Sequence, residues 1–414
     1  MRRRSFFSSV VALSAMPLVS PEVHAATKSA GLKVTGVEIW RVTGDRDQAA
    51  AYQKELGHGT IRNLRNPPTS HTYIKILTNA GVEGFYGPSE SRATRVIQDR
   101  LARSLIGKDP LAIDSIWEDM TRGAHRYTGY DYLIGVSYLD NTLWDLRGKF
   151  FDVPVYKLLG GSRNVIDVYA SAIQQSIEPD RIRESAAQLK EEGYKAQKWF
   201  PERSRQALGK KEYEEDVAMM RILRETVGDN YDIMIDPLLT WNLPYAIKWC
   251  KDVEQYHPRW LEEPFQTYLQ LEPLARLREM TSIPIATGEH NYNRWVFHDL
   301  MKAGAVDILN PDPEWGGGIS EIVRICAMAS AWGLQVSPHH MKQHALAHIV
   351  ASQPHSVCPY VEYRHGMYMG TSYFDKYPIV HNGNSQIELS DRPGFGVELD
   401  ESKIVNMELI YSQS

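Results

Sequence analysis

The sequence predicts an α/β protein with a TIM-like (β/α)7β barrel and a smaller α+β capping domain. The chain has 414 residues, more than one ordinary hydrophobic core accommodates, so two domains are expected. Its first part mixes strand and helix patterns without regular alternation. From about residue 165, short apolar runs recur and each is followed by a helical stretch. Eight such runs fit a closed barrel of parallel strands better than an open sheet.

Residues 1–26 have the layout of an export signal. Arg2–Arg4 form a basic region, Val10–Val19 a short apolar stretch, and Val23–Ala25 ends in the small residue favoured before a cleavage point. Arg3–Phe7 also resembles the twin-arginine signal, which exports folded proteins across a bacterial inner membrane. A periplasmic mature protein is therefore expected. The alternative is a disordered basic tail on a cytoplasmic protein.

The composition narrows the classes of partner. Hydrophobic residues make up 43% and charged residues 23% of the chain, and the formal net charge is -5, so nucleic acid is not an expected partner. No apolar stretch beyond the N-terminus approaches the roughly 18 residues of a membrane span. The three cysteines are too few for a disulfide framework and are expected in or near the core. The expected partners are a small molecule and, in a homo-oligomer, further copies of the chain.

The capping domain is predicted over residues 31–150. Leu32–Val42 and His71–Leu77 alternate like strands, and Arg92–Leu105 and Leu111–Met120 have helical spacing. Between the two strands, residues 44–70 are polar and turn-rich. Because a loop of that length in a compact domain is usually functional or mobile, this segment is a candidate lid.

The barrel is predicted over residues 155–370. Helical stretches such as Tyr213–Val227 and Ser320–Trp332 separate its strand candidates. The C-terminal residues 371–414 are turn-rich and are expected to return to the cap. The eight strand candidates are Val165–Ala170, Ala196–Phe200, Tyr231–Ile235, Trp260–Leu261, Ile283–Ala286, Val306–Asn310, Leu334–Val336 and Tyr360–Val361.

Polar side chains follow these runs at regular intervals. From the third strand onwards they are spaced 23 to 27 residues apart, about one βα unit of a typical barrel. They should therefore meet at the mouth of the barrel, where barrel enzymes place their active sites. The series comprises Lys198, Asp236, Glu262, Glu289, Asp312, His339 and Glu362.

Three of these residues are candidate metal ligands. Asp236, Glu262 and Glu289 follow consecutive strands, and carboxylate oxygens are the ligands that Mg²⁺ prefers. A single carboxylate at a strand end is more often a helix cap or an ion-pair partner, but three in succession predict a metal site. Asp312 and His339, on the next two strands, could form a carboxylate–imidazole pair in which Asp312 makes His339 a better base.

Several motifs resemble those of a known group of enzymes. They are Asp140–Lys149, Lys157–Gly161, Trp260–Pro264, Ala286–His290, Asn310–Asp312 and Trp315–Gly318. With them the chain resembles the enolase superfamily, in particular its mandelate racemase/muconate lactonizing enzyme-like group. Within that group it is most similar to acid-sugar dehydratases such as L-rhamnonate dehydratase. The resemblance covers nearly everything after the signal segment.

The resemblance implies a Mg²⁺-dependent enzyme and a role for each site residue. Asp236, Glu262 and Glu289 match the metal ligands of the group, and Asp312 with His339 matches its general-base dyad. Glu362 matches the acid near the enediolate that forms when the α-proton leaves. In this chemistry the metal binds the substrate carboxylate and stabilises the developing charge.

One departure from the racemase pattern concerns the second strand. Racemases of this group carry two lysines that flank one residue, whereas this chain has Lys198 and Phe200. Since phenylalanine cannot accept a proton, a one-base reaction is expected, in which His339 or His290 protonates the leaving β-hydroxyl. Lys198 either neutralises the substrate carboxylate or only pairs with Asp236. His290 could be turned out of the barrel by strand alternation, although similar dehydratases use a histidine there.

The residues that would recognise the rest of the substrate are less defined. His58, Arg62 and Arg65 are candidate contacts for a polyhydroxy acid, with a solvated loop as the alternative. The segment 201–211 departs from the dehydratase pattern, which leaves the identity of the sugar acid open.

The expected function is a Mg²⁺-dependent lyase that dehydrates an aldonate-type sugar acid to a 2-keto-3-deoxy acid. A cycloisomerase or epimerase acting through the same enediolate is an alternative. A non-catalytic, exported sugar-acid-binding protein is another. The retained Asp312, His339 and Glu362 argue against that last reading, since binding alone requires no base.

Overall fold

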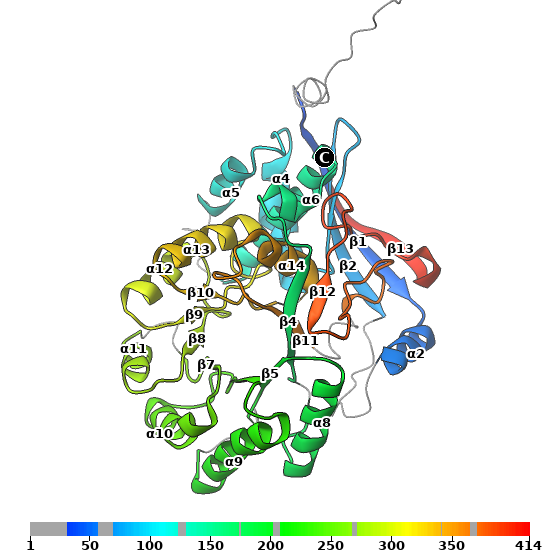
Figure 1. The fold of residues 1–414 in the computed structure, drawn as a ribbon. Helices are drawn as coiled ribbons and strands as arrows, with labels where there is room; N and C mark the ends of the chain where they lie inside the picture. The colour runs from blue at the N-terminus through cyan, green and yellow to red at the C-terminus, as the bar shows by residue number, and fades with distance from the viewer. Residues whose placement is uncertain are drawn as a thin grey trace, which may run out of the picture.

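The protein consists of a small antiparallel sheet with helices and a curled parallel sheet ringed by helices (Figure 1). The computed structural model describes residues 31–56, 69–122, 130–173, 175–201, 208–266, 271–340, 342–364 and 371–414. The segment predicted to be an export signal lies outside these ranges. None of the helices within them combines the length and the apolar character needed to cross a bilayer.

The capping domain is built on a four-stranded antiparallel sheet that joins the two ends of the described chain. Its strands follow the order β13-β1-β2-β3, so the C-terminal strand pairs with the first one. Alternation along β1 buries Val37 and Ile39 in the main core. The strands are β1 (Val34–Gly44), β2 (Ser70–Thr78), β3 (Gly84–Tyr86) and β13 (Ile404–Gln413).

The cap helices agree with the prediction in one place and differ in another. Residues 92–105 are helical as predicted, in three consecutive segments, because the i+5 bonds of a π-helical turn interrupt the α-helical pattern. The candidate lid, predicted as a loop over residues 44–70, begins with a helix, whereas residues 57–68 lie outside the description. The helical segments are α2 (Arg46–Leu56), α3 (Ser91–Val96), η1 (Ile97–Leu101), α4 (Ala102–Leu105), α5 (Ile113–Arg122) and α6 (Tyr130–Phe151).

The parallel sheet confirms the predicted (β/α)7β class. Its strands pair in the order β10-β9-β8-β7-β6-β5-β4-β11, and no ladder joins β10 to β11 in the described ranges. A short helix, α7 (Val155–Leu158), precedes the sheet, and β12 (Gln386–Glu388) pairs antiparallel with the N-terminal residues 165–167 of β4. The strands are β4 (Val165–Ser171), β5 (Ala196–Trp199), β6 (Asp232–Ile235), β7 (Trp260–Glu262), β8 (Ile285–Thr287), β9 (Ile308–Leu309), β10 (Gln335–Val336) and β11 (Val361–Arg364).

A helix follows each of the first seven barrel strands, and local sequence signals set several helix ends. The side chain of Asn242 accepts a hydrogen bond from the backbone N–H of Tyr245 and caps α10, which carries a proline as its second residue. Gly228, with φ +84°, ends α9 in a conformation that other residues rarely adopt. The helices are α8 (Pro179–Glu191), α9 (Lys210–Val227), α10 (Leu243–Val253), α11 (Glu272–Glu279), α12 (Arg294–Lys302), α13 (Ile319–Ala331) and α14 (Gln343–Ser352).

The barrel interior is closed by an apolar layer. Side chains two residues apart on a strand point to the same face, so the next inward side chain towards the mouth of the barrel comes two residues later. The apolar layer therefore lies one inward position below the polar site: Ala196 precedes Lys198, Met234 precedes Asp236, and Trp260 precedes Glu262. The layer forms a cluster separate from the main core and consists of Tyr169, Ala196, Met234, Trp260, Ala286 and Ile308.

The capping domain forms hydrogen bonds with the segment that follows β9. The backbone N–H of Ser320 donates to Asp140 Oδ2 (2.9 Å), and that of Ile319 donates to Asn141 Oδ1 (3.0 Å). Gly318 has φ +82°, and a Cβ there would lie 2.4 Å from Asp140 Oδ2, so the approach requires glycine. Because Asp140 and Asn141 belong to α6, the cap fixes a segment that begins at Asp312.

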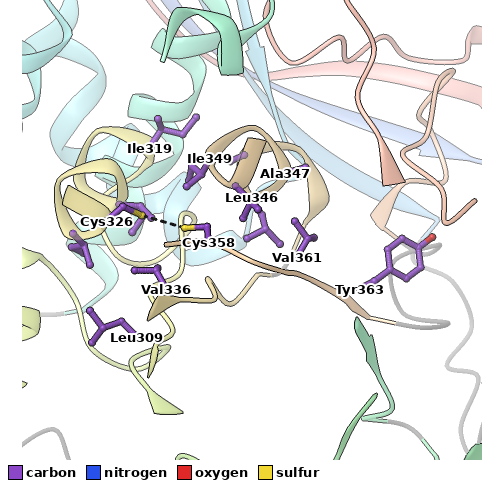
Figure 2. Close-up of a cluster of buried hydrophobic side chains, with 14 of the residues drawn as sticks. Leu309, Ile319, Cys326, Val336, Leu346, Ala347, Ile349, Cys358, Val361 and Tyr363 are labelled. Carbon is purple, nitrogen blue, oxygen red and sulfur yellow. Dashed lines mark hydrogen bonds between the residues drawn. The ribbon is translucent and has the colours of Figure 1, made fainter. Parts of the chain in front are cut away.

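The thiols are buried, as the sequence predicts. Cys250, Cys326 and Cys358 are all free and in the core. Cys326 in α13 and Cys358 before β11 face each other with their Sγ atoms 3.8 Å apart, among apolar side chains such as Leu346 and Val361 (Figure 2).

Candidate active site

The predicted polar series gathers at the C-terminal ends of the barrel strands. Lys198 and Glu362 lie within β5 and β11, and Glu262 ends β7. Asp236 and Glu289 follow their strands by one and two residues, and Asp312 and His339 follow theirs by three. A pocket of about 330 Å³ opens above them and is lined by Ile173, Lys198, Phe200, Asp236, Leu238, Leu239, Thr240, Glu289, His290, Trp315, His339, Glu362 and Arg364.

The three candidate metal ligands lie together. Each of Asp236, Glu262 and Glu289 offers an oxygen within 4.8 Å of the oxygens of the other two, and all three side chains are buried. Burial, with repulsion from Glu362 and Glu289, raises the pKa of Glu262 to about 7, and burial with repulsion from Glu262 raises that of Asp236 well above its usual range. This excess of negative charge fits a divalent cation, which would offset the repulsion.

Lys198 is the cation at the centre of the carboxylates. Its Nζ lies 2.6 Å from Glu262 Oε1, 3.1 Å from Glu362 Oε1 and 3.6 Å from Asp236 Oδ2. Burial alone would lower the pKa of Lys198, but these carboxylates outweigh it and raise the pKa well above its usual range. Asp236 is the most distant of the three, so pairing with that residue alone does not describe the position of Lys198.

Asp312 and His339 form the predicted pair. His339 Nδ1 lies 2.7 Å from Asp312 Oδ2, and Asp312 Oδ1 accepts the backbone N–H groups of Glu314 (2.6 Å) and Trp315 (2.9 Å). The carboxylate is thus held on both oxygens, and His339 directs Nε2 towards Glu289 (3.3 Å). Burial would lower the pKa of His339, but Glu289 and Asp312 raise it to about 10.

His290 lines the pocket instead of turning outwards, which settles the alternative left open by strand alternation. Its Nδ1 lies 2.7 Å from Glu263 Oε2 and 3.5 Å from Glu289 Oε1. Burial lowers the pKa of His290, but the hydrogen bond and charge of Glu263 outweigh it and raise the pKa. Glu263 is buried and has φ +35°, an unusual value for a residue with a Cβ.

Arg364 and Trp315 are among the pocket-lining residues that sequence reasoning did not assign to the site. Arg364 lies two residues after Glu362 in β11, so the same period-two alternation that places Glu362 would have found it. Trp315 belongs to a recognised motif, but its role depends on the cap, since its Nε1 donates to Glu90 Oε1 (2.7 Å). No local sequence signal predicts that contact. Phe200 also lines the pocket, at the position where a second lysine would stand.

The proposed substrate contacts His58, Arg62 and Arg65 lie outside the described residues, as does most of the segment 201–211. Pro201 is buried, and Lys210 and Lys211 are exposed at the start of α9.

Comparison with known proteins identifies the family. Residues 181–403 match the model "Enolase C-terminal domain-like", and residues 67–160 match the model "Mandelate racemase / muconate lactonizing enzyme, N-terminal domain". The chain belongs to the mandelate racemase/muconate lactonizing enzyme family of the enolase superfamily. The resemblance indicated by its motifs is confirmed.

Relatives in this family include acid-sugar dehydratases. The chain is 33% identical over 290 residues to arabinonate dehydratase of Saccharolobus solfataricus, covering 68% of this chain and 75% of that one. It is 30% identical over 344 residues to a putative L-rhamnonate dehydratase of Caldivirga maquilingensis, covering 80% and 82%. Among solved structures, the 3,6-anhydro-D-galactonate cycloisomerase of Zobellia galactanivorans matches with a TM-score of 0.74 and 26% identity, covering 90% and 98%.

The charge balance at Lys198 can be tested through stability. We expect Lys198→Met to lower the free energy of unfolding by about 3–5 kcal/mol in chelator, because it leaves buried carboxylates without their cation. Urea unfolding measures the loss. Lys376→Met is the matched control, since it removes an exposed ion pair with Glu398 and an exposed contact with the ring of Tyr377, and should cost at most about 1 kcal/mol. Equal stability of the two variants would contradict the role of Lys198.

Proposed function

We propose that the protein is a Mg²⁺-dependent dehydratase that converts an aldonate-type sugar acid to a 2-keto-3-deoxy acid. The observation that carries the proposal is a buried carboxylate triad, Asp236, Glu262 and Glu289, beside an Asp312–His339 pair in one pocket. The named activities of the relatives from Saccharolobus and Caldivirga support the substrate class. The test is a panel of aldonates incubated with Mg²⁺ and assayed for 2-keto-3-deoxy acids.

The triad would hold the metal ion. When bound there, Mg²⁺ supplies Lewis-acid chemistry that makes the α-proton of a carboxylate substrate more acidic and stabilises the enediolate. Lys198 adds positive charge beneath the same site. Glu362 Oε2 is buried and has no hydrogen-bond partner among the described residues, so this oxygen is available to the substrate.

The chain's own groups move the protons. His339 takes the α-proton at Nε2, because Asp312 accepts the hydrogen on Nδ1 and fixes the orientation of the ring. The electrons of the broken C–H bond form the enediolate. These electrons then expel the β-hydroxyl, which leaves as water after protonation by a histidine, and the resulting enol tautomerises to the 2-keto acid.

A cycloisomerase is the second candidate, because the Zobellia enzyme shares the fold and an enediolate could serve both reactions. An epimerase is less well supported, because Phe200 stands where a second base would be needed. The same panel separates these functions, since an isomerase yields an isomeric acid and no 2-keto-3-deoxy acid.

The metal requirement is the first prediction for this function. Dialysis against chelator should abolish turnover, and Mg²⁺ should restore it. Glu262→Gln should weaken Mg²⁺ binding by about tenfold or more, since one charged oxygen ligand is lost and tenfold corresponds to about 1.4 kcal/mol. Calorimetric titration measures the affinity, with Glu191→Gln on the exposed side of α8 as the control. Full activity in excess chelator would refute the metal-assisted reaction.

The identity of the base gives a second prediction. His339→Asn should reduce turnover by about 10²-fold to 10⁴-fold and should also abolish exchange of the substrate α-hydrogen with deuterated solvent. Asp312→Asn should act in the same way but less completely, because Asp312 only orients and polarises the ring. His298→Asn, in an exposed part of α12, is the control. Exchange that persists in His339→Asn but vanishes in His290→Asn would reverse the assignment.

We also propose that the mature protein is periplasmic. The order of basic, apolar and small residues within positions 1–26 supports export. In a Gram-negative host, the full-length chain should appear in the periplasm with a new N-terminus near residue 26. Replacement of both Arg3 and Arg4 by lysine should retain the protein in the cytoplasm. An uncut wild-type chain in the cytoplasm would contradict export.

A further inference from the structure

The pocket contains a second carboxylate–imidazole pair besides Asp312 and His339. We propose that Glu263 is a positioning residue that orients His290, and that His290 delivers the proton to the leaving β-hydroxyl. The proposal rests on the dehydratase function and resolves which histidine acts as the acid. Removal of the α-proton and departure of the hydroxyl would then be assigned to different side chains.

Both carboxylate oxygens of Glu263 take part in hydrogen bonds. Oε1 accepts the backbone N–H of Gly288 (3.1 Å) and the hydroxyl of Thr287 (3.3 Å), and Oε2 lies 2.7 Å from His290 Nδ1. The side chain is only 2% exposed, so it cannot reorient towards water. A carboxylate accepts and does not donate, so it selects the tautomer of His290 that carries hydrogen on Nδ1. Nε2, on the opposite side of the ring, is left for the substrate.

The backbone at Glu263 is bent to make this contact. Glu262 turns inwards to Lys198 (2.6 Å), and the next residue sends its side chain to the end of β8. Glu263 adopts φ +35°, which persists in a residue with a Cβ only where its surroundings impose it. Thus Glu262 contacts Lys198 and the next residue, Glu263, contacts His290. The backbone strain lies at Glu263.

The two imidazoles flank the same carboxylate. His339 Nε2 lies 3.3 Å from Glu289 Oε2, and His290 Nδ1 lies 3.5 Å from Glu289 Oε1. The ring of Trp315 contacts both, with centroids 5.3 Å from His339 and 6.1 Å from His290. Each ring has its Nδ1 paired with a carboxylate, Asp312 for His339 and Glu263 for His290. A substrate bound in this pocket would therefore meet the Nε2 atom of each ring.

The difference in exposure fits the difference in role. The side chain of His290 is 36% exposed, whereas that of His339 is 9% exposed. As an acid His290 carries hydrogen on both ring nitrogens. In the proposed step the C–O bond breaks, its electron pair stays on oxygen, and the Nε2 proton completes a water molecule, which leaves the neutral tautomer with hydrogen on Nδ1. His290 then regains a proton directly from solvent. His339 is less open to solvent but not sealed from it, so a proton that it holds can still be replaced by deuterium before one is returned to the enediolate.

Glu263→Gln tests this division of labour. Gly288 N–H is a fixed donor, so the amide oxygen should face it and the NH₂ group should face His290 Nδ1, which imposes the wrong tautomer. We expect 2-keto acid formation to fall by about 10²-fold or more, while deuterium still enters the α-position of recovered substrate. Mg²⁺ affinity, measured separately, should change by less than about threefold. Glu279→Gln, exposed on α11, is the control.

His290→Asn should give the same separation of exchange from elimination, and the double variant should be no slower than either single one. This variant keeps the test intact if Glu263→Gln folds poorly. Unchanged elimination in both variants would assign the acid to His339, and a parallel loss of exchange and elimination would reduce Glu263 to a structural role. A wild-type protein that neither exchanges nor dehydrates any aldonate would instead refute the function itself.

Discussion

The burial of several carboxylates around one ammonium group is the constraint on which the site depends. Four acidic side chains meet at the barrel mouth, and Lys198 contacts three of them. Such a cluster is costly without further positive charge, and a divalent cation bound among the carboxylates would reduce their repulsion. The apolar layer headed by Trp260 lies directly below and excludes water from that side. On the same strands, one inward position is apolar and packs in the barrel, and the next inward position carries a charged group of the site.

The second constraint comes from outside the barrel. The loop after β9 carries Asp312 and Trp315, and the cap holds it through Asp140, Asn141 and Glu90. Because Asp312 orients His339, the position of the base depends on how the two domains dock. A barrel alone would place Asp312 near the mouth but would leave its loop without these partners. The interface between the cap and the barrel therefore helps to set the geometry of the pocket.

Much of this arrangement could be read from the chain. The spacing of Asp236, Glu262 and Glu289 matches one βα unit per step, and parallel strands bring such residues to one edge. The predicted strand bounds were less accurate where the run of apolar residues is longer than the part of the strand that pairs with its neighbours. Residues 306–310 were predicted as a strand, yet only Ile308 and Leu309 join a ladder, because burial of apolar residues extends beyond the hydrogen-bonded part. The helix α2 was missed because its sequence is polar and carries no apolar stripe.

The sequence by itself determined the class of fold and the set of groups at the barrel mouth, because both follow from periodicities of two residues and of one βα unit. The sequence also predicted the pair Asp312 and His339, but only the tertiary structure decided the partners of His290 and Lys198. His290 could have faced either way, and its contact with Glu263 depends on a positive φ that no local pattern predicts. Pairing with Asp236 was one of two expectations for Lys198, but contacts across three strands place it nearer Glu262 and Glu362. Partner choice depends on distances between strands, and these are set by packing that spans the whole barrel.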